Sequence, residues 1–324
     1  MRKSLAANAF MLLIVALMGF GAIIGWGKAK FYEPGPLSEP AFIEVNQGDN
    51  LTKVTPRLIE AGVISDEHIF RLGARYTGLD SQLKFGEYEI PAAASMEAVL
   101  LVLTSGRSVQ YKVTLAEGLS SFEIVQVLLA NEILTGEVAE IPPEGSLAPD
   151  TYLFGRGASR QSILDEMSAS QEKILADAWA VRATDLPIET PEELLILASI
   201  IEKETGVSSE RGQVASVFVN RLNRGMRLQT DPTVIYGITL GREKLGRGLR
   251  VSELQGETPY NTYVISGLPP TPIANPGRLA IEAAANPDST DYLYFVADGT
   301  GGHAFATTLA AHNQNVARWR AAGN

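Results

Sequence analysis

The stretch TPEELLILASIIEKETG, residues 190–206, combines a helix start, a long apolar run and a helix stop. Thr190 is a good N-cap residue, Pro191 suits the first helical turn, and Gly206 ends the pattern. Glu193 stands three residues after Thr190, which is the spacing of a capping box. Because the start and stop signals agree with the apolar residues between them, the stretch predicts one well-defined helix that packs in the core.

Two carboxylates, Glu202 and Glu204, end this apolar run, although acids at a helix C-terminus oppose the helix dipole. At about 100° per residue, Glu204 falls on the apolar arc beside Leu197, and Glu202 lies at the edge of that arc. Lys203 points to the polar side, next to Ser199. A desolvated carboxyl group has a raised pKa, which a general acid at neutral pH requires. The pattern also leaves open that both acids belong to an ordinary solvated helix end.

Composition narrows the possible functions of this chain. Its 324 residues, 45% hydrophobic and 20% charged, are enough to bury a core and to form two domains. The net charge of -10 argues against a nucleic-acid partner, which needs a basic face. The absence of cysteine excludes disulfides, thiolate metal sites and a cysteine nucleophile, and three histidines make a histidine-rich metal centre a poor expectation.

The N-terminal segment is long and apolar enough to cross a membrane. Leu5 to Trp26 carries no charge, and at about 1.5 Å per residue it spans roughly 33 Å as a helix. Arg2 and Lys3 precede it, and Lys28 and Lys30 follow it. We expect residues 1–30 to form a cytoplasmic tip and an uncleaved anchor, with the body outside the cytoplasm. A cleaved signal peptide is the alternative.

The rest of the chain predicts an α+β fold in two parts. Residues 31–40, FYEPGPLSEP, are expected to be a semi-rigid linker outside the core. Residues 41–110 alternate short strand and helix patterns and predict a compact αβ module. Residues 111–324 predict a larger mixed α+β domain with helices in its centre and strands at both ends.

Polar and aromatic residues gather in the segments that follow the helix of residues 190–206. Residues 229–233 are expected to be irregular, and a longer irregular stretch follows residue 257. Ordered loops with amides, hydroxyls and aromatic rings often line a site, and tyrosine faces beside amides suit sugar rings. His303, after two glycines, is better explained as a turn or hydrogen-bonding residue than as a catalyst. The candidate substrate-binding residues are Gln229, Thr230, Asp231, Tyr236, Asn261 and Tyr263.

Five blocks in order carry a resemblance to a known family: ASIIEKET, VASVFVNRL, GMRLQTDPTVIYG, YNTYVISGLPPTPIANPG and YLYFVADGTGGHAF. Together they resemble the endolytic murein transglycosylases, the YceG-like family of bacterial inner-membrane enzymes. The resemblance implies cleavage within peptidoglycan strands between N-acetylmuramic acid and N-acetylglucosamine, which leaves 1,6-anhydromuramoyl ends. It also implies a single-pass protein of the inner membrane, with residues 111–324 as a catalytic domain in the periplasm.

The resemblance further implies a catalytic glutamate in the EKET block. The Glu-Thr pair resembles the Glu-Ser pair of other lytic transglycosylases, which assigns the role to Glu204, with Glu202 as second choice. In this reaction the C6 hydroxyl of the substrate attacks C1, so one carboxyl group can act as acid and then as base. No metal or cofactor is called for. Peptidoglycan strands are the expected partner, and contact with cell wall synthases is an expectation from the family alone.

The small module has a sequence frame of its own. Val45-x-x-Gly48-Asp49-x-Leu51 near its start, and a later frame from Leu83 to Pro91, resemble the LysM module that binds glycans containing N-acetylglucosamine. A structural spacer of that fold is equally compatible with the frame.

Two rival functions remain open from the sequence. A muramidase would hydrolyse the same bond with Asp231 or Glu202 as its second carboxylate. A non-catalytic scaffold would bind glycan without turning it over.

Overall fold

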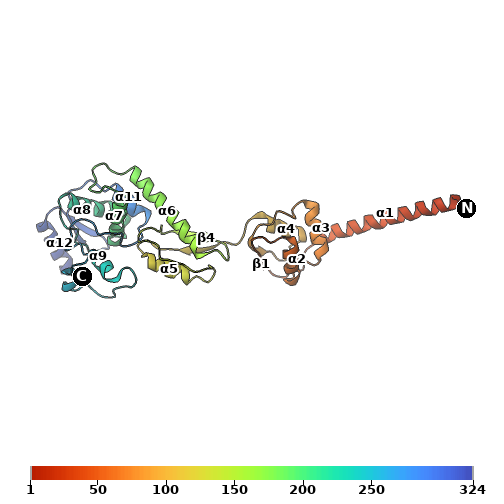
Figure 1. The fold of residues 1–324 in the computed structure, drawn as a ribbon, viewed down its shortest axis with the longest axis horizontal. Coiled ribbons are helices and arrows are strands. Elements are labelled where there is room, and N and C mark those ends of the chain that lie inside the picture. The colour runs from red at the N-terminus through yellow and green to blue at the C-terminus, as the bar shows by residue number, and fades with distance from the viewer. Residues whose placement is uncertain (1, 323–324) are drawn as a thin grey trace. The chain divides into compact units, whose positions relative to one another are not determined.

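The structure is a computed structural model that describes residues 2–322. The chain divides into two compact units (Figure 1). Unit 1 comprises the chain up to Tyr111 together with residues 154–156, and unit 2 comprises residues 112–153 and the chain from residue 157 onward. Helices and short antiparallel strand pairs occur together, so the fold is mixed α+β, as the sequence predicts.

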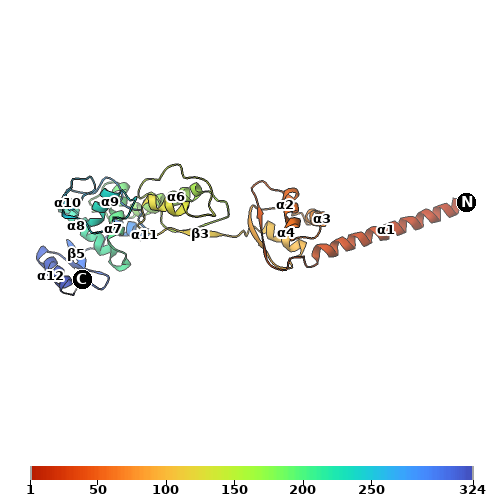
Figure 2. The ribbon, with the colours of Figure 1, turned by 90° about the horizontal axis from the view of Figure 1, so that it is seen from below.

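Unit 1 begins with a long helix, α1 (Arg2–Tyr32), which is continuous over its length (Figures 1 and 2). Ala7–Tyr32 is long and apolar enough to cross a membrane, a property that a membrane anchor shares with a signal sequence. The C-terminal end of α1 is part of the module, because Phe31 is only 4% exposed in its core.

The module of unit 1 is built around one antiparallel strand pair. Its elements are β1 (Ala41–Val45), α2 (Leu51–Glu60), α3 (Glu67–Thr77), β2 (Gly86–Ile90) and α4 (Met96–Ser105). β1 pairs with β2 from Ala41 opposite Ile90 to Val45 opposite Gly86. Asn50, Asp66 and Ser95 cap α2, α3 and α4 through their side chains, so short polar residues set where these helices begin.

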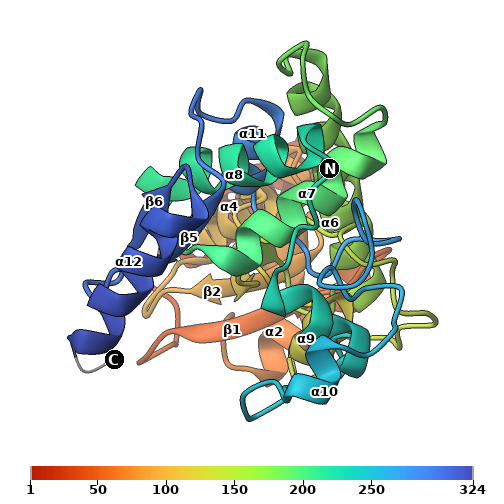
Figure 3. The same cartoon turned by 90° about the vertical axis from the view of Figure 1, so that its left-hand side faces the viewer.

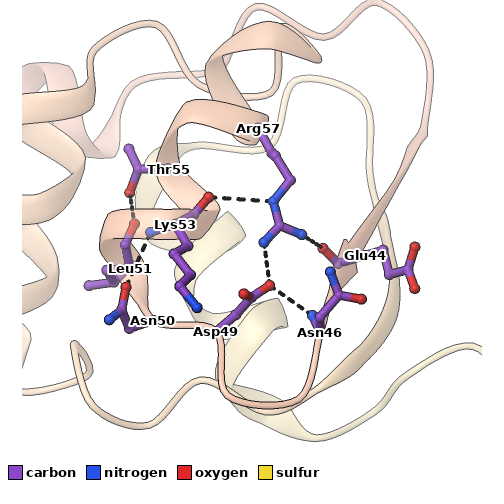
Figure 4. A network of polar contacts seen from close by, with 8 residues as sticks. All are labelled: Glu44, Asn46, Asp49, Asn50, Leu51, Lys53, Thr55 and Arg57. Carbon is purple, nitrogen blue, oxygen red and sulfur yellow. Dashed lines mark hydrogen bonds and ion pairs between the residues drawn. The ribbon is translucent and has the colours of Figure 1, made fainter.

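The turn between β1 and α2 is held by a polar network (Figure 4). The Arg57 guanidinium donates to the Asp49 carboxylate and, at 2.8 Å, to the carbonyl oxygen of Glu44. Asp49 Oδ2 also accepts from the Asn46 backbone N–H at 2.9 Å. Arg57 therefore ties the end of β1 to the loop that leads into α2.

The proline-rich segment after α1 packs against the module. The Gly35 N–H donates to the Ala93 carbonyl at 3.2 Å, and the Ala93 N–H donates to the Leu37 carbonyl at 2.9 Å. A Cβ at Gly35 would lie 2.1 Å from the carbonyl oxygen of Ala94, so only glycine permits this approach. Backbone hydrogen bonds therefore fix this segment to the module.

Unit 2 is organised around one central helix, α7 (Pro191–Glu204), which is labelled with its neighbouring helices in Figure 3. α7 packs against α6 (Arg160–Ala180), α8 (Arg211–Asn223) and α11 (Arg278–Ala285). The remaining elements are β3 (Tyr111–Thr114), α5 (Ser121–Leu129), β4 (Thr151–Phe154), a 3-10 turn (Ser208–Glu210), α9 (Asp231–Thr239), α10 (Val251–Leu254), β5 (Tyr294–Ala297), β6 (His303–Ala306) and α12 (Leu309–Ala321). β3 pairs with β4, and β5 pairs with β6.

The structure differs from two local expectations. Ser199 does not lie on a polar side of α7, because neighbours surround the helix there and Ser199 is fully buried. Residues 229–233 are not irregular throughout, because α9 begins at Asp231 with Thr230 as N-cap residue. Pro232 falls in the first turn of α9, where a missing backbone N–H costs nothing.

Candidate functional site

The candidate site lies in unit 2, at the C-terminal end of α7. Thr190 caps the start of α7 and Pro191 occupies its first turn, as the sequence predicts. The helix ends at Glu204, because Thr205 takes an extended conformation with φ -143°. Its last turn stays attached through the Thr205 N–H, which donates to the Ile201 carbonyl at 3.2 Å. Glu204 is therefore held at the end of a rigid, buried helix.

The Glu204 carboxyl group is desolvated and has one side-chain donor. Thr230 Oγ1 donates a hydrogen bond to Glu204 Oε1, and Glu204 Oε2 accepts none from residues 2–322. Burial raises the pKa of Glu204, and the charge of Asp231 raises it further. The Thr230 hydrogen bond and the charges of His303 and Arg221 oppose this rise. The result is a carboxyl group that keeps its proton to a higher pH than an exposed glutamate does.

Two buried threonines, Thr233 and Thr262, hold the backbone of Thr230 and so fix where its side chain starts. The Thr230 backbone N–H donates to Thr262 Oγ1 at 3.0 Å, and the Thr262 and Thr233 hydroxyls lie 2.8 Å apart. Thr233 Oγ1 in turn donates to the Thr230 carbonyl at 2.7 Å. Gln229 enters this arrangement with a positive φ of 51°, and its N–H donates to the Thr262 carbonyl at 3.1 Å. The loop of residues 261–263 and the start of α9 therefore form one support for Thr230.

Asp231 and Tyr263 form a second pair beside Glu204. The Tyr263 hydroxyl donates to Asp231 Oδ1 at 2.6 Å. Burial raises the pKa of Tyr263, and its hydrogen bond to Asp231 adds to that rise, so the phenol stays protonated as a donor. The charges of both Asp231 and Glu204 act on this phenol, which places the three groups in one electrostatic neighbourhood.

Asn261 supports this loop from inside the protein. Its side chain is fully buried, and its amide donates to the carbonyls of Glu253, Leu254 and Gly256 at 3.2, 3.1 and 2.7 Å. Its side-chain oxygen accepts from the Tyr263 N–H at 3.0 Å. Backbone groups therefore occupy both ends of the Asn261 amide, and its direct effect is on the position of Tyr263.

Tyr236 belongs to a different cluster from Thr230 and Asp231. Its hydroxyl donates to Glu144 Oε2 at 3.2 Å, and its ring meets the Tyr260 ring edge-on at 5.0 Å between centroids. Glu144 Oε1 accepts from the Ser121 N–H at 2.8 Å and from the Asn275 amide at 3.1 Å. Burial raises the pKa of Glu144. The sequence did not single out Glu144, because a lone acid between prolines and a glycine resembles an ordinary loop residue.

The Glu202 side chain is also shielded from solvent, but its carboxylate already has partners within the protein. Its side chain is 6% exposed, and Oε2 accepts from the Gly277 N–H at 3.0 Å. Arg211 Nη2 lies 3.7 Å from Glu202 Oε1 and 3.5 Å from Glu117 Oε2. Burial raises the pKa of Glu202, and the charge of Glu117 adds to the rise, while Gly277 and Arg211 oppose it. Glu202 thus connects the end of α7 to the start of α11.

Two residues of basic type near Glu204, Arg221 and His303, were not predicted as site residues. Arg221 is 8% exposed and donates to the carbonyls of Leu293 and Leu228 at 2.7 and 2.6 Å, so it holds backbone and not a carboxylate. His303 Nδ1 lies 2.9 Å from Glu210 Oε2, and its backbone N–H donates to the other oxygen of Glu210 at 3.1 Å. His303 therefore has the hydrogen-bonding role expected of it. An arginine that follows the apolar run VASVFVN in the last turn of the same helix was the available signal for Arg221.

Comparisons with a family profile and with individual proteins all relate this chain to the YceG-like family and to endolytic murein transglycosylases. A sequence profile of the YceG-like family matches residues 43–318. The endolytic murein transglycosylase of Bacillus subtilis strain 168 is 28% identical over 328 residues, which cover 91% of this chain and 89% of that protein. The endolytic murein transglycosylase of Streptococcus pneumoniae strain D39 is 30% identical over 85% of this chain, which spans 57% of the pneumococcal protein.

A solved structure supports the same relationship at the level of the fold. The crystal structure of a yceG-like protein from Listeria monocytogenes aligns with a TM-score of 0.54 and 30% sequence identity. The alignment covers 85% of this chain and 98% of the Listeria chain.

Proposed function

Because the chain belongs to the YceG-like family, we propose that it is an endolytic lytic transglycosylase of peptidoglycan. It cleaves the bond between N-acetylmuramic acid and N-acetylglucosamine inside glycan strands. The observation that carries the proposal is the Glu204 carboxyl group, desolvated at the end of α7 and held by the Thr230 hydroxyl.

Glu204 acts first as a general acid. Its raised pKa keeps the carboxyl group protonated at a pH at which an exposed glutamate is ionised. The proton passes to the glycosidic oxygen, the bond from that oxygen to C1 of N-acetylmuramic acid breaks, and C1 gains oxocarbenium character. The carboxylate left behind keeps its hydrogen bond from Thr230.

Glu204 then acts as a general base. It accepts the proton of the C6 hydroxyl of the same muramic acid residue while the C6 oxygen forms a bond to C1, which closes the 1,6-anhydro ring. The proton count is restored at Glu204, and no water is consumed. Because the nucleophile is part of the substrate, orientation supplies much of the rate, and the protein has to hold the sugar and keep water away.

The polar residues beside Glu204 are proposed to hold the sugars. Asp231 and Tyr263 present a hydrogen-bonded pair close to the acid, and the charge of Asp231 suits a developing positive charge at C1. Gln229 and Thr230 line the other part of the same loop. Tyr236, on its separate cluster, offers a ring for the face of a neighbouring sugar. Asn261 contributes through its hold on Tyr263.

Glu202 is the alternative acid, and its contacts argue against it. Its carboxylate already accepts from Gly277 and faces Arg211, so protonating a substrate would break a structural connection. Those contacts also leave Asp231 as the second carboxylate that a muramidase would need near Glu204.

The N-terminal part of the chain is proposed to anchor the enzyme. α1 serves as a single-pass anchor in the bacterial cytoplasmic membrane, with unit 2 on the outer side in the periplasm. Unit 1 is proposed to be LysM-like, since pairing of β1 with β2 brings the two parts of its sequence frame together. Cell wall synthases are the proposed protein partners.

Mass spectrometry of the products tests the proposal. Purified glycan strands are digested with the wild-type protein, the Glu204→Gln variant and the matched Glu202→Gln variant. We expect anhydro-ended products from the wild type, a loss of at least about a hundredfold for Glu204→Gln, and substantial activity for Glu202→Gln. Reducing ends would identify a muramidase. Equal turnover by the wild type and Glu204→Gln would refute the assignment of Glu204.

A further inference from the structure

An apolar groove of about 560 Å³ lies within unit 1, between α1 and α3. Its walls include Phe20, Ile23 and Trp26 of α1 and Ile69, Leu72 and Tyr76 of α3. Leu72 and Tyr76 are 70% and 76% exposed, and Trp26 is 58% exposed. Leaving several large apolar side chains together in water is unfavourable, so this surface is suited to an apolar environment.

The position of α3 beside α1 is fixed by close packing. Phe31 is 4% exposed, and a Cβ at Gly73 would lie 2.2 Å from an atom of the Phe31 ring. Any larger residue at position 73 would push α3 away from α1. The groove is therefore a defined surface of the module and moves with the end of the anchor.

The length of α1 places this groove at the membrane surface. The uncharged stretch from Leu5 to Trp26 spans roughly 33 Å, close to the hydrocarbon thickness of about 30 Å. The part of α1 that lines the groove begins in the last two turns of this stretch, at Phe20, and continues to Lys28 and Tyr32, so the groove extends from the outer end of the hydrocarbon region to the level of the lipid headgroups. Tryptophan and tyrosine are typical of this level. The Lys28 ammonium lies 5.7 Å from the centre of the Tyr76 ring, as in a cation–π contact at a wet edge.

We propose that the α3 face of the groove docks into the outer leaflet of the same membrane that α1 crosses, with Leu72 and Tyr76 inserted among the lipids. The partner is a phospholipid bilayer, because the groove is continuous with the membrane-spanning helix. Lys28, the one charged residue that lines the groove, suits phosphate headgroups. Unit 1 is thus attached to the membrane by a helix that spans it and by a second helix that lies on it. The proposal rests on retention of α1 as an anchor.

The absence of cysteine allows a direct test with single labels. Full-length chains carrying Leu72→Cys, Tyr76→Cys, Ala61→Cys or Ala16→Cys are labelled with a nitroxide. They are reconstituted in vesicles of phosphatidylethanolamine and phosphatidylglycerol. Ala61 is an exposed control at the end of α2, and Ala16 is a control inside the anchor. Power saturation compares the access of oxygen, which enters lipid, with that of a nickel chelate, which stays in water.

We expect the oxygen-to-nickel ratio at positions 72 and 76 to exceed that at position 61 several-fold and to approach the ratio at position 16. Ratios at 72 and 76 equal to that at 61, with position 16 in lipid, would overturn docking and leave the anchor intact. A water-like ratio at position 16 would overturn both the membrane docking of α3 and the role of α1 as an anchor. Spectral broadening at position 72 that disappears on dilution with unlabelled chain would show that a second copy covers the groove, which also overturns the proposal.

Discussion

Thr230 donates its hydroxyl hydrogen to Glu204 and so joins the N-cap residue of α9 to the last residue of α7. This hydrogen bond lowers the pKa of Glu204, whereas burial raises it by a larger effect. The hydroxyl of Thr230 therefore offsets part of the rise in the Glu204 pKa that burial causes. It also holds the carboxyl group in one orientation, because Thr230 is itself fixed by Thr262.

Replacing Thr230 by valine keeps its shape and removes the hydroxyl. We expect the pKa of Glu204 to rise further, so that the alkaline limb of the pH–rate profile moves to higher pH. A hydrogen bond to a charged group contributes about 1.5–3 kcal/mol, so the maximal rate should fall roughly tenfold or more. Rates of anhydro-product release between pH 4 and pH 9 measure both effects.

Thr230→Ser is the matched control for this change. It keeps the hydroxyl and should retain most of the rate and the wild-type alkaline limb. An unchanged profile for Thr230→Val would contradict a role for this hydrogen bond.

The raised pKa of Glu204 also predicts a pH-dependent cost in stability. A carboxyl group whose pKa is raised in the folded state stabilises the fold below its ordinary pKa of 4.5, and that contribution is lost as pH rises through the folded pKa. Glu204→Gln has no proton to lose. We therefore expect this variant to melt above the wild type at pH 7, by about 2–4 °C for each kcal/mol gained, and the difference to shrink near pH 4.

Scanning calorimetry at both pH values measures the difference. Glu192→Gln is the matched control, since Glu192 lies on the same helix but is exposed, and it should show no comparable gain. A Glu204→Gln variant that melts below the wild type at pH 7 would show that Glu204 is not a strained buried acid.

Local signals in the sequence predicted the central helix well. Thr190 and Pro191 act within their own turn, so their roles follow from neighbouring residues alone. The environment of Ser199 did not follow, because helical periodicity assumes one solvated side, and the loop around Ile273 covers that side of α7. That contact joins residues that are 74 positions apart in the chain, and no local pattern contains it.

In the candidate site, too, the sequence predicted features that depend on local composition but not contacts that depend on the folded chain. The loops that carry Asp231 and Tyr263 were predicted as site segments from their composition, and the structure places those two side chains in contact. The sequence suggested the same role for Asn261, whose amide donates to the carbonyls of Glu253 in α10 and Gly256 just after it. Polar residue type indicated the region, whereas side-chain direction depends on how the loop folds back on itself.

Ser199 provides a test of the contact that the periodicity missed. Its hydroxyl donates to the Ile196 carbonyl at 2.7 Å and accepts from the Ile273 N–H at 3.0 Å. Ser199→Ala would leave the Ile273 N–H buried without its acceptor, which costs about 1–3 kcal/mol. Urea unfolding of unit 2 measures this loss. Ser209→Ala, at an exposed serine, should stay within about 0.5 kcal/mol of the wild type. Equal stabilities of the two variants would argue against the Ser199–Ile273 connection.

Arg57 gives the corresponding prediction for unit 1. It holds Asp49, whose side chain is 8% exposed, and the Glu44 carbonyl, so Arg57→Met removes two hydrogen bonds from the turn after β1 (Figure 4). Since the Arg57 side chain is itself 36% exposed, we expect a loss of only about 1–2 kcal/mol. Hydrogen exchange of the β1 and α2 amides measures this loss within unit 1. Arg71→Met is the matched control, because Arg71 is about as exposed as Arg57 but its partner Glu67 is 38% exposed, so the Arg71–Glu67 pair should contribute little.

The Arg57–Asp49 pair also predicts how the loss of stability in Arg57→Met depends on pH. The Arg57 hydrogen bond lowers the pKa of Asp49 below its ordinary value of 3.8. A lowered pKa means that the ionised pair stabilises the fold above that ordinary value, and that this contribution is lost as pH falls through the lower, folded pKa. The difference between the wild type and Arg57→Met should therefore be complete at pH 6 and decrease below pH 3.8. If the difference is the same at pH 6 and at pH 3, the Asp49 carboxylate does not contribute through Arg57, and the effect of the substitution comes from the Glu44 carbonyl alone.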